Sequence, residues 1–183
     1  NDRDRGILLS AGIPEERVFL LPNAVSPPVS GIEPGSRTPA GGEPLILYPT
    51  RAIRRKNLGE LLLLSAVCPG FRFATTLSPQ NPLWQEIHAE WVALGRELGL
   101  KVAFAAGEER GVRFPDLVRE CAAMVTTSVG EGFGLAFLEP WLVDAPLVGR
   151  DLPEITRDFQ SNGINLNGLY REWPVPVRLF HEN

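Results

Sequence analysis

From Leu45 to Val148 the chain alternates short apolar runs with longer amphipathic stretches, and this alternation limits the folds it can adopt. The runs expected to form strands cover residues 45–48, 71–77, 102–105, 124–128 and 147–148. Helices are expected over residues 58–67, 82–98, 115–121 and 134–143. Nearly continuous apolar strands that alternate with helices are typical of a parallel sheet covered on both faces. We therefore expect an α/β fold with a doubly wound, Rossmann-like parallel sheet over residues 45–183.

The first 44 residues differ in composition from the rest of the chain. Residues 3–12 can form a short helix ended by Gly and Pro, and residues 18–21 have the pattern of an apolar strand. Residues 26–44 are rich in Pro, Gly and Ser and are expected to be a linker. Because the chain starts at Asn1 and has a single, interior methionine, we expect a larger protein to supply an upstream part.

Charge and composition exclude several functional classes. With a net charge of −4 the chain is too acidic to track a nucleic-acid backbone, so we expect no nucleic-acid partner. No stretch approaches the roughly 18 apolar residues that a membrane helix needs, so we expect no transmembrane segment. Cys68 and Cys121 lie far apart, which favours free thiols in a reducing compartment, and we expect a cytoplasmic protein.

A glycine-rich turn follows the strand expected over residues 124–128. It reads Val-Gly-Glu-Gly-Phe-Gly over residues 129–134 and leads into the helix that carries Glu139. Glycines at such a turn let the backbone approach a ligand closely, and the free amides of the first helical turn favour an anion. The turn is therefore a candidate phosphate site.

Glu131 and Glu139 flank this turn and lie eight residues apart. On one helix this spacing is about 12 Å along the axis, too far for the carboxylates to share a proton or a metal ion. They can instead bind hydroxyls at the two ends of a long ligand whose middle is a diphosphate. With sixteen glutamates in the chain, a pair eight residues apart is expected by chance, so the spacing alone does not indicate a binding site. The position of the pair around a glycine-rich turn that follows a buried strand is what favours a functional role.

A basic cluster, Pro-Thr-Arg-Ala-Ile-Arg-Arg-Lys-Asn, covers residues 49–57 between the first strand and the first helix of the domain. Cations at a helix N-terminus are unfavourable to the helix dipole, so an anion bound among them explains the cluster better. Arg51 and Lys56 are the stronger candidates. A solvated charge run remains the alternative, chiefly for Arg54 and Arg55.

Other chemistry has little support in the sequence. His88 lies beside the Trp84 and Trp91 face of a helix and His181 lies near the chain end, so both are expected to be structural. Zinc-ligand spacing, a Ser, His and Asp set, and the phosphate-binding loop with Gly-Lys-Ser/Thr are not found in the sequence. We therefore expect no metal and no cofactor.

The two main motifs resemble those in the C-terminal half of group 1 retaining glycosyltransferases, which have the two-domain GT-B fold. The family's E-x7-E element resembles residues 131–139, including the opening Glu-Gly-Phe-Gly. Its Arg and Lys, five residues apart after the first strand of that half, resemble Arg51 and Lys56. The two motifs together are specific, although either alone would be weak.

Two shorter elements extend the resemblance over most of residues 18–163. The family's Pro-Asn-Gly-Val strand end resembles residues 22–25, with alanine at the usual glycine, and its Pro-Glu-Ile element resembles residues 153–155. The chain departs from the family where Gly-Arg-Asp-Leu replaces a more glycine-rich loop. Arg150 in that loop is a further candidate for anion binding.

The resemblance assigns roles to these residues. Arg51 and Lys56 would bind the donor diphosphate and stabilise the departing nucleotide, and Glu139 would hold the ribose hydroxyls. Glu131 would face the transferred sugar, so the expected catalytic residues are Glu131, Arg51 and Lys56. Backbone amides would contact sugar or phosphate at Gly132, Phe133, Gly134 and Leu135.

The resemblance implies a hexosyltransferase that moves a hexose from a nucleotide-diphosphate sugar, such as a UDP- or GDP-hexose, to an acceptor with retention of configuration. Residues 1–25 would end the preceding domain, and the acceptor-binding N-terminal domain is missing from this chain. The chain alone is therefore expected to bind the donor and to be inactive. A sugar-nucleotide epimerase and a noncatalytic nucleotide-sugar-binding module are the alternatives. The base, the acceptor and any association of the full-length protein with a membrane surface stay open.

Overall fold

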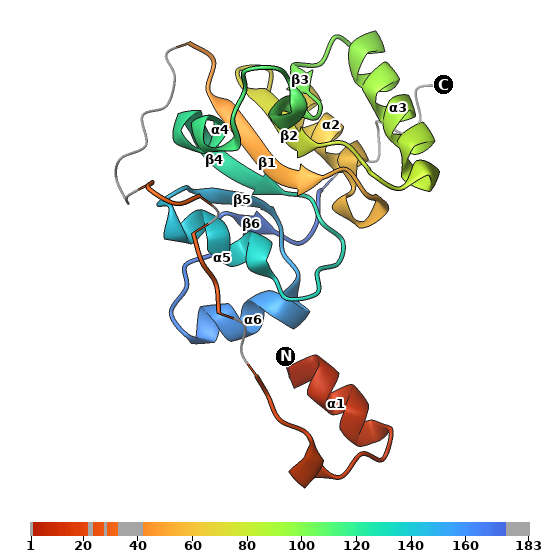
Figure 1. Ribbon diagram of the computed structural model, residues 1–183, viewed down its shortest axis with the longest axis vertical. Coiled ribbons are helices and arrows are strands. Elements are labelled where there is room, and N and C mark those ends of the chain that lie inside the picture. Colours follow the sequence, from red (N-terminus) through yellow and green to blue (C-terminus); the bar gives the residue numbers. More distant parts are fainter. Residues whose placement is uncertain (1, 22–23, 28, 33–41, 175–183) are drawn as a thin grey trace.

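The computed structural model of the chain describes residues 2–21, 24–27, 29–32 and 42–174. Within these residues six parallel strands form one sheet, in the order β3-β2-β1-β4-β5-β6 (Figure 1). The strands are β1 (Leu45–Arg51), β2 (Arg72–Leu77), β3 (Val102–Ala103), β4 (Cys121–Thr126), β5 (Leu147–Arg150) and β6 (Leu169–Tyr170). The expected doubly wound, Rossmann-like parallel sheet is confirmed.

Helices cover both faces of the sheet (Figure 1). The helices of the described residues are α1 (Asp2–Ser10), which stands away from the sheet in Figure 1, α2 (Leu58–Val67), α3 (Pro82–Glu97), α4 (Phe114–Glu120), α5 (Leu135–Leu142) and α6 (Pro153–Ser161), with the 3-10 turns η1 (Glu15–Arg17), η2 (Arg54–Lys56) and η3 (Ala106–Glu108). Leu45 and Leu47 pack with α4 on one face, whereas Ile46 and Tyr48 pack with α2 on the other. Burial on both faces explains why β1 begins with four apolar residues in a row, 45–48.

The strands and helices predicted between residues 45 and 150 are all present, with shifts of a few residues at their ends. The expected elements do not include α6 or β6. The buried residues of α6 are Ile155 and Thr156, and β6 is only two residues long. β6 is therefore too short to give a periodic signal, whereas Ile155 and Phe159 in α6 lie four residues apart on one face, a helical pattern that could have indicated this short helix. No helix in the described part of the chain is long and apolar enough to span a membrane.

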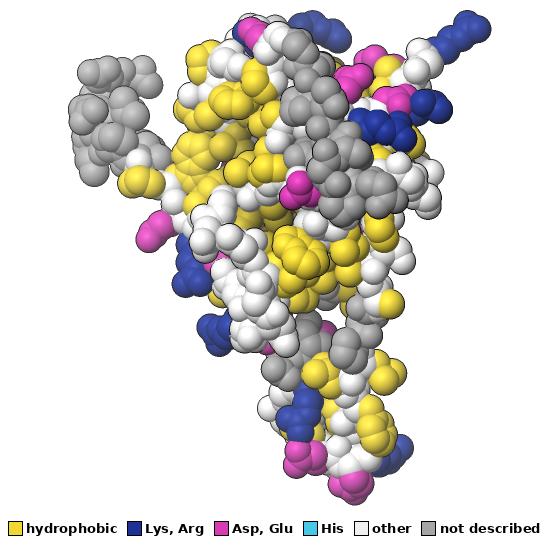
Figure 2. Space-filling model, turned by 90° about the vertical axis from the view of Figure 1, so that its left-hand side faces the viewer, with side chains coloured by type: hydrophobic (Ala, Val, Ile, Leu, Met, Phe, Trp, Pro, Cys, Tyr) yellow, Lys and Arg dark blue, Asp and Glu magenta, His cyan; other side chains and the backbone are white. Residues whose placement is uncertain are grey.

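No strand forms over residues 18–21, so that prediction was wrong. Phe19 and Leu21 are 77% and 84% exposed. Figure 2 shows hydrophobic side chains on the surface of the N-terminal segment, at the lower end of the view. A strand needs a neighbour to pair with its N–H and C=O groups, and no described strand lies beside this segment. The assignment of residues 1–25 to a preceding domain stays a prediction.

The segment predicted to be a linker, residues 26–44, contributes to the core. Val29 and Ile32 are buried and pack in the cluster that includes Leu45 and Val118. Burial of two branched side chains anchors this part of the segment to the α4 face of the sheet. Composition does not indicate this contact, because isolated apolar residues between Pro and Gly carry no periodicity. Residues 33–41 lie outside the described residues.

Not all large apolar side chains in and directly after α3 are buried. Ile87, Leu94 and Leu98 are exposed, and Gly95 is the buried residue of the helix. A Cβ atom at Gly95 would lie 3.3 Å from both Leu62 Cδ2 and Phe104 Cε2. The small residue therefore lets α3 approach its neighbours closely, which a count of apolar side chains does not predict.

The centre of the sheet positions the candidate site. β1 and β4 lie side by side, and the chain continues from them in opposite directions, through β2 and β3 on one side and β5 and β6 on the other. In doubly wound sheets the crevice beyond the carboxyl ends of two such strands binds ligands. By this rule the crevice of this sheet is expected between the loops after β1 and β4, residues 52–57 and 127–134, which lie at those carboxyl ends.

Replacing Gly149 with alanine should destabilise the sheet strongly. Gly149 has a φ of +129°, and a Cβ atom there would lie 2.0 Å from the carbonyl oxygen of Thr126 on the neighbouring strand. We expect Gly149→Ala to lower the free energy of unfolding by about 3 kcal/mol or more. Gly163→Ala is the control: its φ is +89° but its Cβ meets nothing within 4 Å, so about 1 kcal/mol is expected. Urea denaturation of both variants measures the difference, and equal losses would contradict the argument.

Candidate functional site

The loops after β1 and β4 are held together by buried hydroxyl groups. The Thr127 hydroxyl contacts the carbonyl oxygens of Lys56 at 2.8 Å and Asn57 at 3.1 Å. The Tyr48 hydroxyl lies 3.2 Å from the Lys56 carbonyl oxygen and 2.9 Å from Ser128 Oγ. The Val129 amide donates to the Arg55 carbonyl at 2.9 Å. These bonds fix the peptides around Lys56 against the end of β4.

Lys56 and Glu131 form an ion pair in this crevice. The Nζ atom of Lys56 donates to Oε1 of Glu131, and the two side chains are only 12% and 8% exposed. A buried pair is costly to break from one side, because the remaining charge is left without a partner. The structure therefore brings together one cation and one carboxylate that the sequence assigned to the same ligand.

Glu139 lies beside this pair, on the second turn of α5. Burial raises the pKa of Glu139 above its usual range; the Lys56 ammonium lowers it and the Glu131 carboxylate raises it further. All three charged groups therefore act on one another in one site. The helix α5 starts at Leu135, so Glu131 lies in the loop before it, and the spacing of about 12 Å for a shared helix does not apply.

The glycines of the turn have different roles. A Cβ atom at Gly132 would meet nothing within 4 Å, so the backbone there is open to a ligand. Gly134 has a φ of +73°, and a Cβ atom would lie 2.4 Å from Ile155 Cγ2 on α6. No side chain caps the N-terminus of α5, so its first amides face the site without a side-chain partner. Phe133 is exposed and Leu135 is half-buried.

Arg51 points to a different part of the crevice. Its Nη1 atom donates to the Ser78 carbonyl at 3.2 Å, at the end of β2. Glu108 accepts from the Ser78 amide and hydroxyl, each at 2.9 Å, and these bonds lower the pKa of Glu108. Lys56, Glu131 and Glu139 thus gather on the β4 side, whereas Arg51 lies on the β2 side. Arg54 and Arg55 are exposed.

Three residues near the site were not singled out by the sequence reasoning. Tyr48 and Thr127 hold the loop, and buried Glu60 in α2 binds Asn57. The spacing Asn-x-x-Glu at the start of α2 resembles a capping pattern and could have indicated Glu60. Arg150, expected as an anion-binding residue, instead donates from Nε and Nη2 to Glu60, at 2.9 and 2.7 Å.

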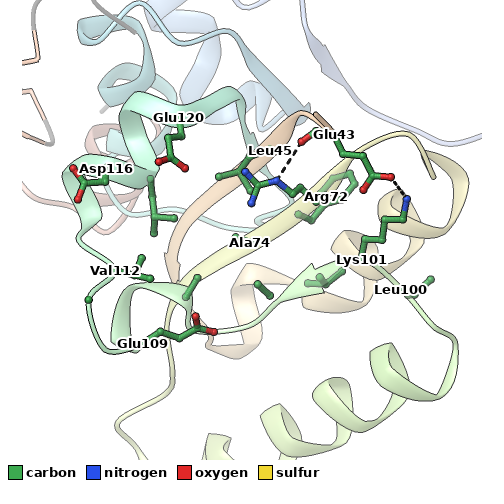
Figure 3. A pocket seen from close by; sticks show the side chains of 16 residues that line it. Glu43, Leu45, Arg72, Ala74, Leu100, Lys101, Glu109, Val112, Asp116 and Glu120 are labelled. Atoms are coloured by element: carbon green, nitrogen blue, oxygen red, sulfur yellow. Dashed lines mark hydrogen bonds and ion pairs between the residues drawn. The ribbon is translucent and has the colours of Figure 1, made fainter. Parts of the chain in front are cut away.

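Two cavities lie outside the cluster of Lys56, Glu131 and Glu139. The larger, about 650 Å³, lies near the amino ends of β1 to β3, far from the crevice. Figure 3 shows that Arg72 and Lys101 at its rim both turn to Glu43. These cations already have partners, so the cavity offers no free basic group of the kind a phosphate needs.

The second cavity, about 450 Å³, lies between the loop after β1 and α3. It is lined mainly by apolar and aromatic side chains, including Trp84, His88 and Trp91, with Arg54 at the loop. His88 packs edge-on against Phe104, and burial lowers its pKa below its usual range. This packing fits the expected structural role of His88. In the described residues no three His, Cys, Asp or Glu side chains cluster as metal ligands do.

The raised pKa of Glu139 predicts how its replacement changes stability with pH. Between the ordinary pKa of 4.5 and the raised value, the folded chain holds a proton that the unfolded chain releases. Stability therefore falls as the pH rises through this window. Glu139→Gln cannot ionise and so lacks this loss. The free energy of unfolding of the variant, relative to that of the wild type, should therefore be more favourable at about pH 7 than at about pH 4.

Urea denaturation at the two pH values checks this expectation. Glu90→Gln on α3 is the control, because it removes one negative charge from an exposed position. An equal effect of Glu139→Gln at both pH values would contradict the burial of a charged carboxylate at the site.

The chain is similar in sequence to a mannosylglucosyl-3-phosphoglycerate synthase of Petrotoga mobilis, with 28% identity over 185 residues. The match covers 88% of this chain and 34% of the synthase, so the chain spans about a third of the length of this relative. No family model matches the sequence.

Solved glycosyltransferases have the same fold as this chain. TarM of S. aureus, solved with UDP, has a TM-score of 0.65 and 17% identity, covering 94% of this chain and 32% of TarM. The pneumococcal O-GlcNAc transferase GtfA, solved with UDP and GlcNAc, has a TM-score of 0.53 and 20% identity, covering 97% and 33%. The C-terminal domain of the group 1 protein LpcC of Francisella tularensis has a TM-score of 0.52 and 18% identity, covering 66% and 70%. The resemblance seen in the sequence is confirmed at the level of the fold, which is that of the C-terminal domains of group 1 GT-B glycosyltransferases.

Proposed function

We propose that this chain is the donor-binding domain of a retaining hexosyltransferase that uses a nucleotide-diphosphate sugar. One observation carries the proposal: the Lys56 side chain, 12% exposed, pairs with Glu131 in the loop before α5 and interacts with Glu139 in that helix, at the carboxyl ends of β1 and β4. Lys56 and the first amides of α5 supply positive charge for a diphosphate. Glu131 and Glu139 supply acceptors for hydroxyl groups.

The chemistry of the reaction suits this arrangement. Negative charge grows on the diphosphate as the bond to the sugar breaks, and a fixed cation and fixed amides lower the energy of that charge. In the structure Lys56 is paired with Glu131, so this ion pair would open when the donor binds. Lys56 would then bind a phosphate, and Glu131 would accept a hydrogen bond from a sugar hydroxyl. Because both groups find new hydrogen-bond partners, neither charged group is left without a hydrogen bond.

Arg51 is the second proposed contact of the diphosphate. It now donates to the Ser78 carbonyl, a neutral partner, and a phosphate oxygen would be a stronger acceptor. Its place between the ends of β1 and β2 puts it beside the Ser78 and Glu108 pair. On this proposal the guanidinium leaves Ser78 when the donor enters.

Similar proteins support a sugar donor, because two of the solved neighbours contain UDP and one also contains GlcNAc. The curated relative is a synthase of a glycosylated phosphoglycerate, which also fits sugar transfer. The acceptor would bind a second domain, so this chain alone is proposed to bind the donor without turnover. We place the full-length protein in the cytoplasm.

Calorimetric titration of this chain with UDP, GDP, ADP and their hexose conjugates tests the donor site. We expect one nucleotide to bind saturably. The double variant Lys56→Met/Glu131→Gln removes both charges of the pair together and should weaken binding at least about tenfold, as expected for one lost charge-assisted hydrogen bond. Glu139→Gln should weaken binding in the same direction, since an amide oxygen accepts more weakly from ribose hydroxyls.

Lys101→Met is the matched control, because Lys101 is 47% exposed and pairs with Glu43 at the other end of the sheet. Its binding should equal that of the wild type. If no nucleotide or nucleotide sugar binds the wild type, or if the double variant binds equally well, the proposed donor site is wrong.

A further inference from the structure

Glu60 is a buried carboxylate that has no role in the proposed reaction. It lies in the first turn of α2, with its side chain 7% exposed, and accepts four hydrogen bonds. Asn57 Nδ2 donates at 2.6 Å, Arg150 donates twice, and the Tyr170 hydroxyl donates at 2.6 Å. One carboxylate thus joins the loop after β1 to the ends of β5 and β6.

The hydrogen bond between Glu60 and Asn57 stabilises the backbone conformation of Asn57, which directly follows Lys56. Asn57 has a φ of +48° and a ψ of +60°, the left-handed conformation that residues other than glycine adopt rarely. The bond from its side chain to Glu60 helps to hold this conformation. A change in the backbone at Asn57 turns the preceding peptide, and with it the direction in which the Lys56 side chain leaves the loop.

The loop is therefore fixed from two directions. Thr127 holds the carbonyl oxygens of Lys56 and Asn57 from β4, and Glu60 holds the Asn57 side chain from α2. Glu60 is itself fixed by Arg150 and Tyr170, 90 and 110 residues further along the chain. The Tyr170 hydroxyl keeps its proton for this bond, since burial and the bond to Glu60 raise its pKa above the usual value.

We propose that Glu60 is a positioning residue, which presents the Lys56 amine to the donor diphosphate by holding Asn57 in place. The proposal rests on the proposed function for its ligand, and its structural part can be tested without a nucleotide. Glu60 touches none of the charged groups that would contact the donor. It acts through Asn57 and the peptide that follows Lys56.

The experiment uses the two lysines of the chain, Lys56 and Lys101. Brief reaction with acetic anhydride, followed by mass spectrometry of peptides, measures the labelling rate of each amine. Lys56 is 12% exposed and paired, whereas Lys101 is 47% exposed, so Lys56 should label more slowly. The ratio of the two rates reports the position of Lys56, with Lys101 as the internal reference.

Glu60→Gln should raise this ratio at least about fivefold, because the loop loses its charged anchor. Tyr170→Phe removes only one of the four bonds and should raise the ratio by a smaller factor. If Glu60→Gln does not fold, as judged by circular dichroism, Tyr170→Phe decides the test. An unchanged ratio in the folded variants would overturn the proposal.

Asp151→Asn is the matched control for a lost buried carboxylate. Asp151 is 6% exposed and binds Thr156 and Arg171, with no bond to the loop after β1. It should leave the ratio unchanged, and an equal rise would show a general loosening of the fold and overturn the proposal.

Nucleotide affinity gives the second measurement. Glu60→Gln should weaken the binding of the nucleotide that the wild type prefers, whereas Asp151→Asn should not. A raised labelling ratio with unchanged affinity would overturn the link to the donor. If the wild type binds no nucleotide, the proposed function fails, while the labelling ratio still decides whether Glu60 positions Lys56.

Discussion

The contact between Thr127 and the loop after β1 is the interaction on which the crevice depends. β1 and β4 are neighbouring parallel strands, but after β1 the chain continues to β2 on one side of the sheet, and after β4 it continues to β5 on the other side. Without a link, the two loops that follow these strands would therefore be independent. The Thr127 hydroxyl and Tyr48 together bind the peptides around Lys56. Burial raises the pKa of Tyr48, so its hydroxyl keeps the proton that it donates. The link therefore persists over the neutral pH range.

The charges in the crevice restrict how a ligand can lie there. Lys56 is the cation beside the N-terminus of α5, and Glu131 and Glu139 are acidic groups next to it. A phosphate placed against either carboxylate would be repelled, whereas a hydroxyl would be bound. A ligand with phosphates in the middle and hydroxyls on both sides satisfies all three groups. A nucleotide-diphosphate sugar has this order, which is why the proposed function follows from the arrangement and not from any single residue.

The central sheet could be predicted from the sequence, because strands buried on both faces are mostly apolar. Residues 18–21 show the same pattern without forming a strand, since apolar character does not supply a pairing partner. The gathering of Lys56 with Glu131 and Glu139 also follows from the sequence, as both loops leave the carboxyl ends of adjacent strands. The direction of Arg51 toward Ser78 does not, because it depends on which neighbouring carbonyl is in reach.

The contacts of Glu60 show why tertiary pairing limits such prediction. Arg150 was expected to bind an anion, and it does bind a carboxylate, but one supplied by α2 of the same chain. The basic residue could be recognised from sequence, whereas its partner depends on the register of β5 against β4 and of β6 against β5. Because Arg150 and Tyr170 come from the last strands of the sheet, the loop that carries Lys56 is fully held only once the whole sheet has formed. The geometry at the crevice is thus a property of the complete fold, even though its charged residues come from two short loops and one helix.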